Sequence, residues 1–149
     1  MMKKIFVLCV FTLMSFCIYA QSYVDLGLPS GIRWKRSNEP GYYSIRNAVS
    51  YFGSSLPSEE QWEELKRECK WTWNGNGYKV TGPNGNYIHL TLEGYINTIA
   101  GKTYGMSSEG KYVYNTRTGG YFYITKGEIG FYSSSSKDRE YSVRLVSYD

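Results

Sequence analysis

Cysteine is scarce in this sequence, and its three cysteines are not placed to form a disulfide or a shared metal site in the mature chain. Of the three cysteines in 149 residues, Cys9 and Cys17 lie in the first twenty positions, which we predict below to be removed on export. Cys69 is then alone, so an internal disulfide and a zinc site built from paired cysteines are both excluded. The apolar core must therefore hold the fold without covalent cross-links.

Histidine is scarcer still, since His89 is the only one. It stands between Ile88 and Leu90 in a predicted strand, where alternation directs it to the face opposite its neighbours. A lone strand histidine is more often a surface residue than a catalytic base. A Ser-His-Asp arrangement would depend on this one residue.

Strong charge of either sign is also lacking. With the first twenty residues set aside, fifteen basic residues face thirteen acidic ones, a net charge of about +2. That charge is too small to indicate nucleic acid or an anionic membrane as a partner. The string AGKTY, residues 100–104, ends like a phosphate-binding loop, but Ile96 stands where such a loop needs its first glycine.

The N-terminal residues have the pattern of a secretory signal peptide. A short basic start, Met1–Lys4, precedes the apolar run Ile5–Tyr19, and Ala20 ends a plausible cleavage site before Gln21. The run is shorter than the roughly 18 residues that span a bilayer; a retained signal anchor is the alternative. We therefore predict a signal peptide over residues 1–20 and one domain over residues 21–149. The mature chain is expected in the periplasm, at the cell surface or outside the cell, without membrane insertion.

Two segments have the apolar spacing of helices. The first begins after Ser44, a good N-cap, and ends at Gly53, with apolar residues at helical intervals between them. The second lies in LPSEEQWEELKRECKWTW, residues 56–73. There Ser58 and Gln61 form a capping box.

One face of this second helix is predicted to pack on the core. Trp62, Leu65 and Cys69 fall at i, i+3 and i+7, so we expect them to be buried together. Five acidic residues belong to the same segment: Glu59, Glu60, Glu63, Glu64 and Glu68. A glycosidase-like pair is conceivable among them, but we favour a solvated helix face. For Cys69 we favour a place in the core over a role as nucleophile.

Short strands with turn signals fill the rest of the chain. Early strands are expected at 23–28 and 32–34, and a hairpin at 78–92 around the turn Gly82–Asn86. Four strands follow at 111–115, 121–125, 129–133 and 141–148. We expect Gly94–Gly110 to be a long irregular loop and the place for function. Strands grouped around two early helices indicate an α+β fold with antiparallel sheets.

Tyrosine is the compositional anomaly, with fifteen tyrosines and four tryptophans after residue 20. Tyrosine-rich surfaces that also carry Ser, Gly and Asn recur at recognition sites, and sugar stacking is one use. Tyrosine is also simply a good strand residue that keeps its hydroxyl in water. Composition leaves both interpretations open.

Four segments together resemble the fibrobacter major paralogous domain, a family common in exported and surface proteins of Bacteroidetes. They are YVDLGLPSGIRW (23–34), LPSEEQWEELKRECKWTW (56–73), GYKVTGPNGNYIHL (77–90) and YSVRLV (141–146). The resemblance implies a C-type-lectin-like fold: two short helices packed on antiparallel sheets, paired terminal strands and a long loop that presents the ligand.

The resemblance does not extend to the calcium-dependent sugar site of true lectins. Its only similar string, Glu39-Pro40-Gly41, stands in the wrong part of the chain. No EF-hand loop is present either. We therefore expect no metal and no cofactor.

On these grounds the chain is expected to be a non-catalytic binding module for a protein or carbohydrate ligand. Five residues in or near the Gly94–Gly110 loop are the candidate ligand contacts: Tyr95, Tyr104, Tyr114, Arg117 and Tyr121. Tyrosine would supply stacking area and Arg117 a fork of donors. The alternatives are a structural subunit of a surface assembly, and a hydrolase that uses a loop carboxylate such as Glu93 or Glu109. The ligand's identity and the oligomeric state do not follow from the sequence.

Overall fold

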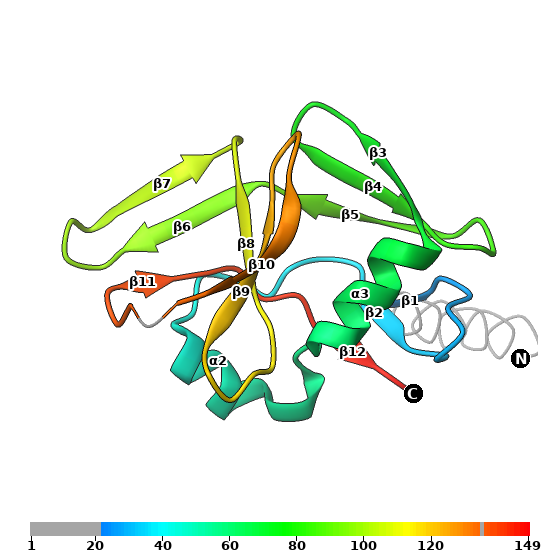
Figure 1. Ribbon diagram of the computed structural model, residues 1–149, viewed down its shortest axis with the longest axis horizontal. Helices are drawn as coiled ribbons and strands as arrows, with labels where there is room; N and C mark the ends of the chain where they lie inside the picture. Colours follow the sequence, from blue (N-terminus) through cyan, green and yellow to red (C-terminus); the bar gives the residue numbers. More distant parts are fainter. Residues whose placement is uncertain (1–21, 135) are drawn as a thin grey trace, which may run out of the picture.

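A computed structural model describes residues 22–134 and 136–149 (Figure 1). The predicted signal peptide lies outside this part of the chain. The described helices are α2 (Ile45–Phe52), the 3-10 turn η1 (Gly53–Ser55) and α3 (Glu59–Glu68). The α+β class predicted from the sequence is confirmed.

The two ends of the described chain meet in one small sheet. Its order is β1 (Tyr23–Asp25), β2 (Arg33–Lys35) and β12 (Val146–Ser147), all antiparallel. Trp34 of β2 pairs with Val24 on one side and with Val146 on the other. The predicted pairing of terminal strands is therefore confirmed, and Figure 1 shows the C-terminus beside β2.

A second sheet follows α3 along the chain. It contains β3 (Lys70–Trp73), β4 (Gly77–Thr81) and β5 (Tyr87–Thr91) in that order. The β4–β5 hairpin turns at Gly82–Asn86 as predicted, with the Gly85 N–H donating to the Gly82 carbonyl. His89 is exposed on β5 while Ile88 and Leu90 are buried, which confirms the predicted alternation.

The third sheet has the order β10-β9-β8-β6-β11, and β7 pairs with β6. Its strands are, in chain order, β6 (Glu93–Asn97), β7 (Lys102–Met106), β8 (Gly110–Val113), β9 (Gly120–Ile124), β10 (Ile129–Ser133) and β11 (Arg139–Glu140). Strands β8, β9 and β10 form the predicted antiparallel meander. The expectation of purely antiparallel sheets is wrong, because β6 meets β8 in parallel at Gly94 and Gly110. At this point the Gly94 amide donates to the Glu109 carbonyl (2.8 Å).

The expected long loop at Gly94–Gly110 is also wrong. Strands β6 and β7 form an antiparallel hairpin that projects from the body at the left of Figure 1. The Asn97 side chain closes the turn by accepting from the amides of Ile99 and Ala100. Gly94 and Gly105 interrupt the apolar alternation, which is why the sequence reads as irregular there.

The final predicted strand, 141–148, is broken into pieces. Tyr141 forms a bridge with Tyr43, and Ser142 forms another with Tyr112, before β12 begins at Val146. The segment thus passes from one sheet to another instead of continuing one ladder. Alternation of apolar residues does not record such a change of partner.

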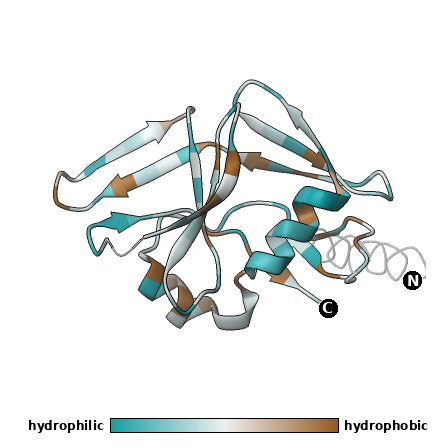
Figure 2. Cartoon of the chain, viewed as in Figure 1, coloured by the Kyte–Doolittle hydropathy of each residue, from teal (hydrophilic) through white to brown (hydrophobic). Residues whose placement is uncertain are grey.

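Helix α3 lies on the larger of two cores. Trp62 is fully buried, stacks on Phe122 at 4.2 Å between ring centroids and lies 4.6 Å from Trp34. The capping box between Ser58 and Gln61 is present, as predicted. Figure 2 shows α3 as mostly hydrophilic along the ribbon facing the viewer. Helix α2, capped by Ser44 and ended by Gly53, packs on the second core with Val113, Tyr141 and Val143.

Two details of the α3 prediction need correction. Glu64 is buried rather than solvated, because its carboxylate accepts from the amide of Ser30 (3.0 Å) and from the Ser30 hydroxyl (2.6 Å). Cys69 stands just after the helix in extended conformation and is only partly buried beside Trp62 and Leu65. The turn that supplies Ser30 is far away in sequence, so the helical pattern alone does not show it.

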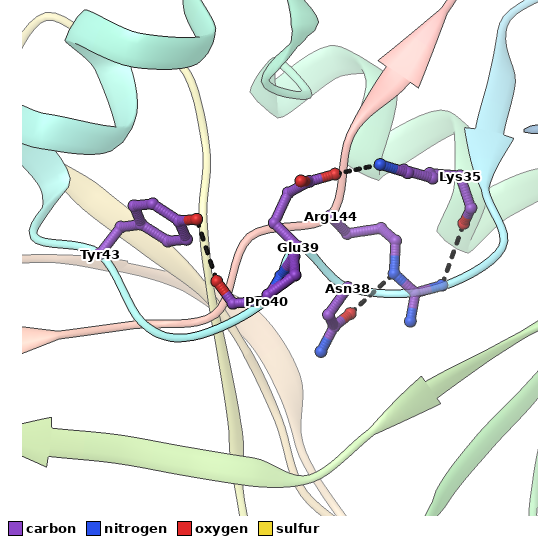
Figure 3. Close-up of polar contacts among 6 residues, drawn as sticks. All are labelled: Lys35, Asn38, Glu39, Pro40, Tyr43 and Arg144. Carbon is purple, nitrogen blue, oxygen red and sulfur yellow. Dashed lines mark hydrogen bonds and ion pairs between the residues drawn. The ribbon is translucent and has the colours of Figure 1, made fainter. Parts of the chain in front are cut away.

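Arg144 is buried and joins the end of β2 and the loop after it to β5; Figure 3 shows its contacts with Lys35 and Asn38. Its guanidinium donates to Asn38 Oδ1 (2.7 Å), to the carbonyls of Lys35 and Arg36 (3.1 Å each) and to the His89 carbonyl (2.7 Å). Burial lowers the pKa of Arg144, opposed by the nearby Tyr112 and Glu93. Four acceptors satisfy this buried cation, so its role is architectural.

Candidate binding face

Strand β9 has two sides with different surroundings. Phe122 and Ile124 are fully buried in the larger core, while Tyr121 and Tyr123 alternate with them and lie half-buried on the opposite side. Tyr132 on the neighbouring β10 stands opposite Tyr121 and stacks on it, with centroids 6.0 Å apart and planes 17° from parallel. The register of the two strands thus gathers three tyrosines on one side of the sheet.

Lys111 of β8 lies among these rings and is 6% exposed. Its Nζ is 4.0 Å from the ring centroid of Tyr95, 5.0 Å from that of Tyr121 and 5.9 Å from that of Tyr123. The Glu109 carboxylate is 3.5 Å away. Burial lowers the pKa of Lys111, and Glu109 opposes that shift. The ammonium is held by ring faces and one carboxylate, an arrangement that stabilises a cation when water is largely excluded.

Beside Lys111 the surface is hollowed. The hollow has a volume of about 240 Å³ and is lined by Glu109, Lys111, Tyr121, Tyr123, Glu128 and Tyr132. The Tyr123 hydroxyl donates to Glu109 (3.1 Å), and the Tyr132 hydroxyl donates to Glu128. Burial, followed by the Glu109 hydrogen bond, raises the pKa of Tyr123 to about 12. The hollow therefore offers ring surface, carboxylate acceptors and protonated phenols.

The projecting hairpin extends this surface. Tyr95 of β6 and Tyr104 of β7 stack at 5.8 Å, with planes 24° apart, and Arg139 lies over the Tyr95 ring at 5.1 Å. Tyr104 is 42% exposed and Met106 56%. We call the surface made by Tyr95, Tyr104, Tyr121, Tyr123, Tyr132 and Lys111 the tyrosine face.

The five contact residues predicted from the sequence lie in three different parts of the structure. Tyr95, Tyr104 and Tyr121 come together in the tyrosine face. Tyr114 is buried and packs edge-on against Phe131 at 5.3 Å, within the larger core. Arg117 is exposed on the loop between β8 and β9, where it lines a separate groove.

Sequence reasoning missed Lys111, Tyr123 and Tyr132. The alternation in YFYIT does signal that Tyr121 and Tyr123 share one side of a strand. No local pattern signals that a lysine would be buried between them, because that depends on the pairing of β8 with β9.

The residues considered for hydrolysis have separate partners. Glu93 accepts from Asn38 and Thr91, Glu109 from Tyr123, and His89 lies 3.4 Å from Asn74. Cys69 has its pKa raised to about 11, first by burial and then by Glu64 and Glu68. Such a thiol is a poor nucleophile at neutral pH.

Two absences hold for residues 22–134 and 136–149. Within them, no group of three or more His, Cys, Asp or Glu side chains is placed to hold a metal ion. None of the helices described there combines the length and the apolar character needed to cross a membrane.

No family model, no curated protein and no solved structure matches this chain. Membership of the fibrobacter major paralogous family therefore stays a prediction from the four sequence segments.

Proposed function

We propose that the protein is an exported, non-catalytic binding module with a C-type-lectin-like fold, related to the fibrobacter major paralogous domain. The paired terminal strands, the two helices and the separate antiparallel hairpins support this fold. The tyrosine face is the proposed ligand surface. Its ligand is a carbohydrate or a protein, and the chemistry of the hollow favours carbohydrate.

The observation that carries the proposal is the two stacked tyrosine pairs on one surface, Tyr95 with Tyr104 and Tyr121 with Tyr132. Ring faces bind the C–H side of a sugar, while Glu109 and Glu128 accept from its hydroxyls. The rings are already ordered by Lys111 and by one another. A ligand would therefore bind with little loss of side-chain freedom.

A glycan array probed with the purified protein tests the proposal, followed by titration of the best glycan against single variants. Tyr104→Ala and Tyr132→Ala should each weaken binding about tenfold or more, since stacked aromatic anchors dominate such contacts. Tyr51→Ala is the matched control: Tyr51 is 73% exposed on α2, outside the tyrosine face.

Two results would count against the assignment. One is a bound glycan whose affinity is unchanged by both tyrosine variants. The other is an array without binding together with a protein captured from the native culture through the same tyrosines. The second result would support the tyrosine face as the binding surface but show that its ligand is a protein and not a carbohydrate.

A further inference from the structure

A second hollow, separate from the tyrosine face, lies beside helix α2. Tyr141 packs on Tyr121 at 5.0 Å, and its hydroxyl is 3.0 Å from Ser134 Oγ at the edge of this hollow. The volume is about 530 Å³, within the range of roughly 300–1,000 Å³ typical of ligand pockets. Helix α2, the β8–β9 loop and the segment after β10 supply the lining.

The charged side chains of this hollow all have one sign. They are Arg46 on α2, Arg117 on the β8–β9 loop and Lys137 before β11, and no acidic side chain is among the described residues that line it. All three are exposed, and none has an ion pair or hydrogen bond from its side chain within the described part of the chain. We call this hollow, defined by these three residues with Ile45, Val49 and Thr118, the basic groove.

The uncharged lining narrows the class of ligand. Ile45 and Val49 form an aliphatic wall, and Thr118 and Ser44 contribute hydroxyls, but no aromatic ring lines the described part of the groove. A sugar would find no ring for stacking there, in contrast to the tyrosine face. An aliphatic side chain fits the wall, and carboxylates fit the guanidinium forks of Arg46 and Arg117.

We propose that the basic groove is a second binding site, which takes an acidic peptide segment of a partner protein with an aliphatic residue between its carboxylates. This inference goes beyond the proposed carbohydrate function and does not depend on it. Charge complementarity is the ground for the choice: three unpaired cations around an aliphatic wall attract an anionic chain and orient it. The module would then bind a glycan with one surface and a protein with the other.

The test is calorimetric or NMR titration of the purified protein with a blocked hexapeptide, Glu-Leu-Glu-Glu-Leu-Glu. Two matched peptides are compared: one with Gln for every Glu, and one with Ala for every Leu. We expect saturable binding of the first peptide, at least tenfold weaker binding of the Gln peptide, and a several-fold loss for the Ala peptide. Affinity should also fall as salt rises.

Variants locate the site. Arg46→Ala and Arg117→Ala should each weaken peptide binding at least fivefold. Arg33→Ala removes the same charge from an exposed position on β2, outside the groove, and should change the affinity less than twofold. Tyr104→Ala should leave peptide affinity unchanged, which separates this site from the tyrosine face. Circular dichroism checks that each variant folds.

The proposal is overturned if the acidic peptide does not saturate, or if the Gln peptide binds equally well. An effect of Arg33→Ala as large as that of Arg117→Ala would also overturn it, because attraction would then be to net charge alone. Tighter binding of an oligogalacturonate, lost in Arg117→Ala, would replace the peptide by an acidic saccharide and so refute the assignment.

Discussion

Arg144 provides the sharpest test of how the loop after β2 is held against β5. Replacing it with alanine removes a buried cation and leaves three carbonyls and the Asn38 amide oxygen without their donor. Each hydrogen bond to a charged group contributes roughly 1.5–3 kcal/mol, but the four are not additive. Loss of one partner from a buried ionic contact typically costs about 3–5 kcal/mol.

We therefore expect Arg144→Ala to lower the free energy of unfolding by about 4 kcal/mol, from a total of roughly 5–15 kcal/mol for a domain. Arg144→Lys should lower the free energy of unfolding by less than Arg144→Ala does, but it should still lower it, because one ammonium lacks the planar fork that reaches acceptors on two segments. Urea unfolding followed by the fluorescence of the buried Trp34 and Trp62 measures the change. Arg33→Ala is the control and should stay within about 0.5 kcal/mol.

A loss below about 1 kcal/mol for Arg144→Ala would contradict this expectation. It would mean that water replaces the guanidinium at these acceptors, and that the loop at 35–39 is held by other contacts. Those contacts are the Lys35–Glu39 ion pair and the bond from the Glu39 amide to the Val143 carbonyl (2.8 Å), part of which Figure 3 shows.

Two further predictions concern the hairpin and the lone thiol. Gly94→Ala should destabilise the β6–β7 hairpin strongly, because Gly94 has φ +65° and an added Cβ would overlap the Tyr104 carbonyl. Gly101→Ala is the control: Gly101 has φ +63° but open space around it, so this change should cost only about 1 kcal/mol. Hydrogen exchange of the β6 and β7 amides compares the two variants, and equal destabilisation would contradict the predicted overlap at Gly94. Alkylation of Cys69 at pH 8, followed by peptide mass spectrometry, should be about a hundredfold slower in the folded protein than in urea, since its pKa rises from 9.0 to about 11. Because the pKa of Cys69 is higher in the folded than in the unfolded protein, the thiol contributes stability below pH 9 that is lost as pH rises through about 11. Equal alkylation rates in the folded and unfolded protein would contradict the burial of Cys69.

Local chemistry was predictable where the signal lies within a few residues. The Ser58–Gln61 capping box, the turn at Gly82–Asn86 and the exposure of His89 each depend on neighbours in sequence, and the structure has all three. The hairpin at Gly94–Gly110 was missed because two glycines interrupt its alternation. One of them, Gly94, is there because β7 approaches too closely for a side chain.

Contacts between distant segments were not predictable in the same way. Glu64 reads as one of five solvated glutamates, yet Ser30, thirty-four positions earlier, makes it a buried acceptor. Likewise, three of the five expected contact residues gather only because β8 pairs with β9 and β7 with β6. Sequence supplies the kind of residue at each site, whereas strand register decides which residues meet.

The tyrosine face and the second core are parts of one side of the same sheet. Near Val113 and Tyr141 that side is covered by α2, and the apolar residues there are buried. Further along β8 and β9 the helix no longer covers it, and Lys111 takes the place of a core residue among the rings. Its ammonium is almost fully buried and lies over the rings of Tyr95 and Tyr121, which orders them. The uncovered half of the sheet is thus a rigid, partly desolvated surface, which is what a binding site needs before its ligand arrives.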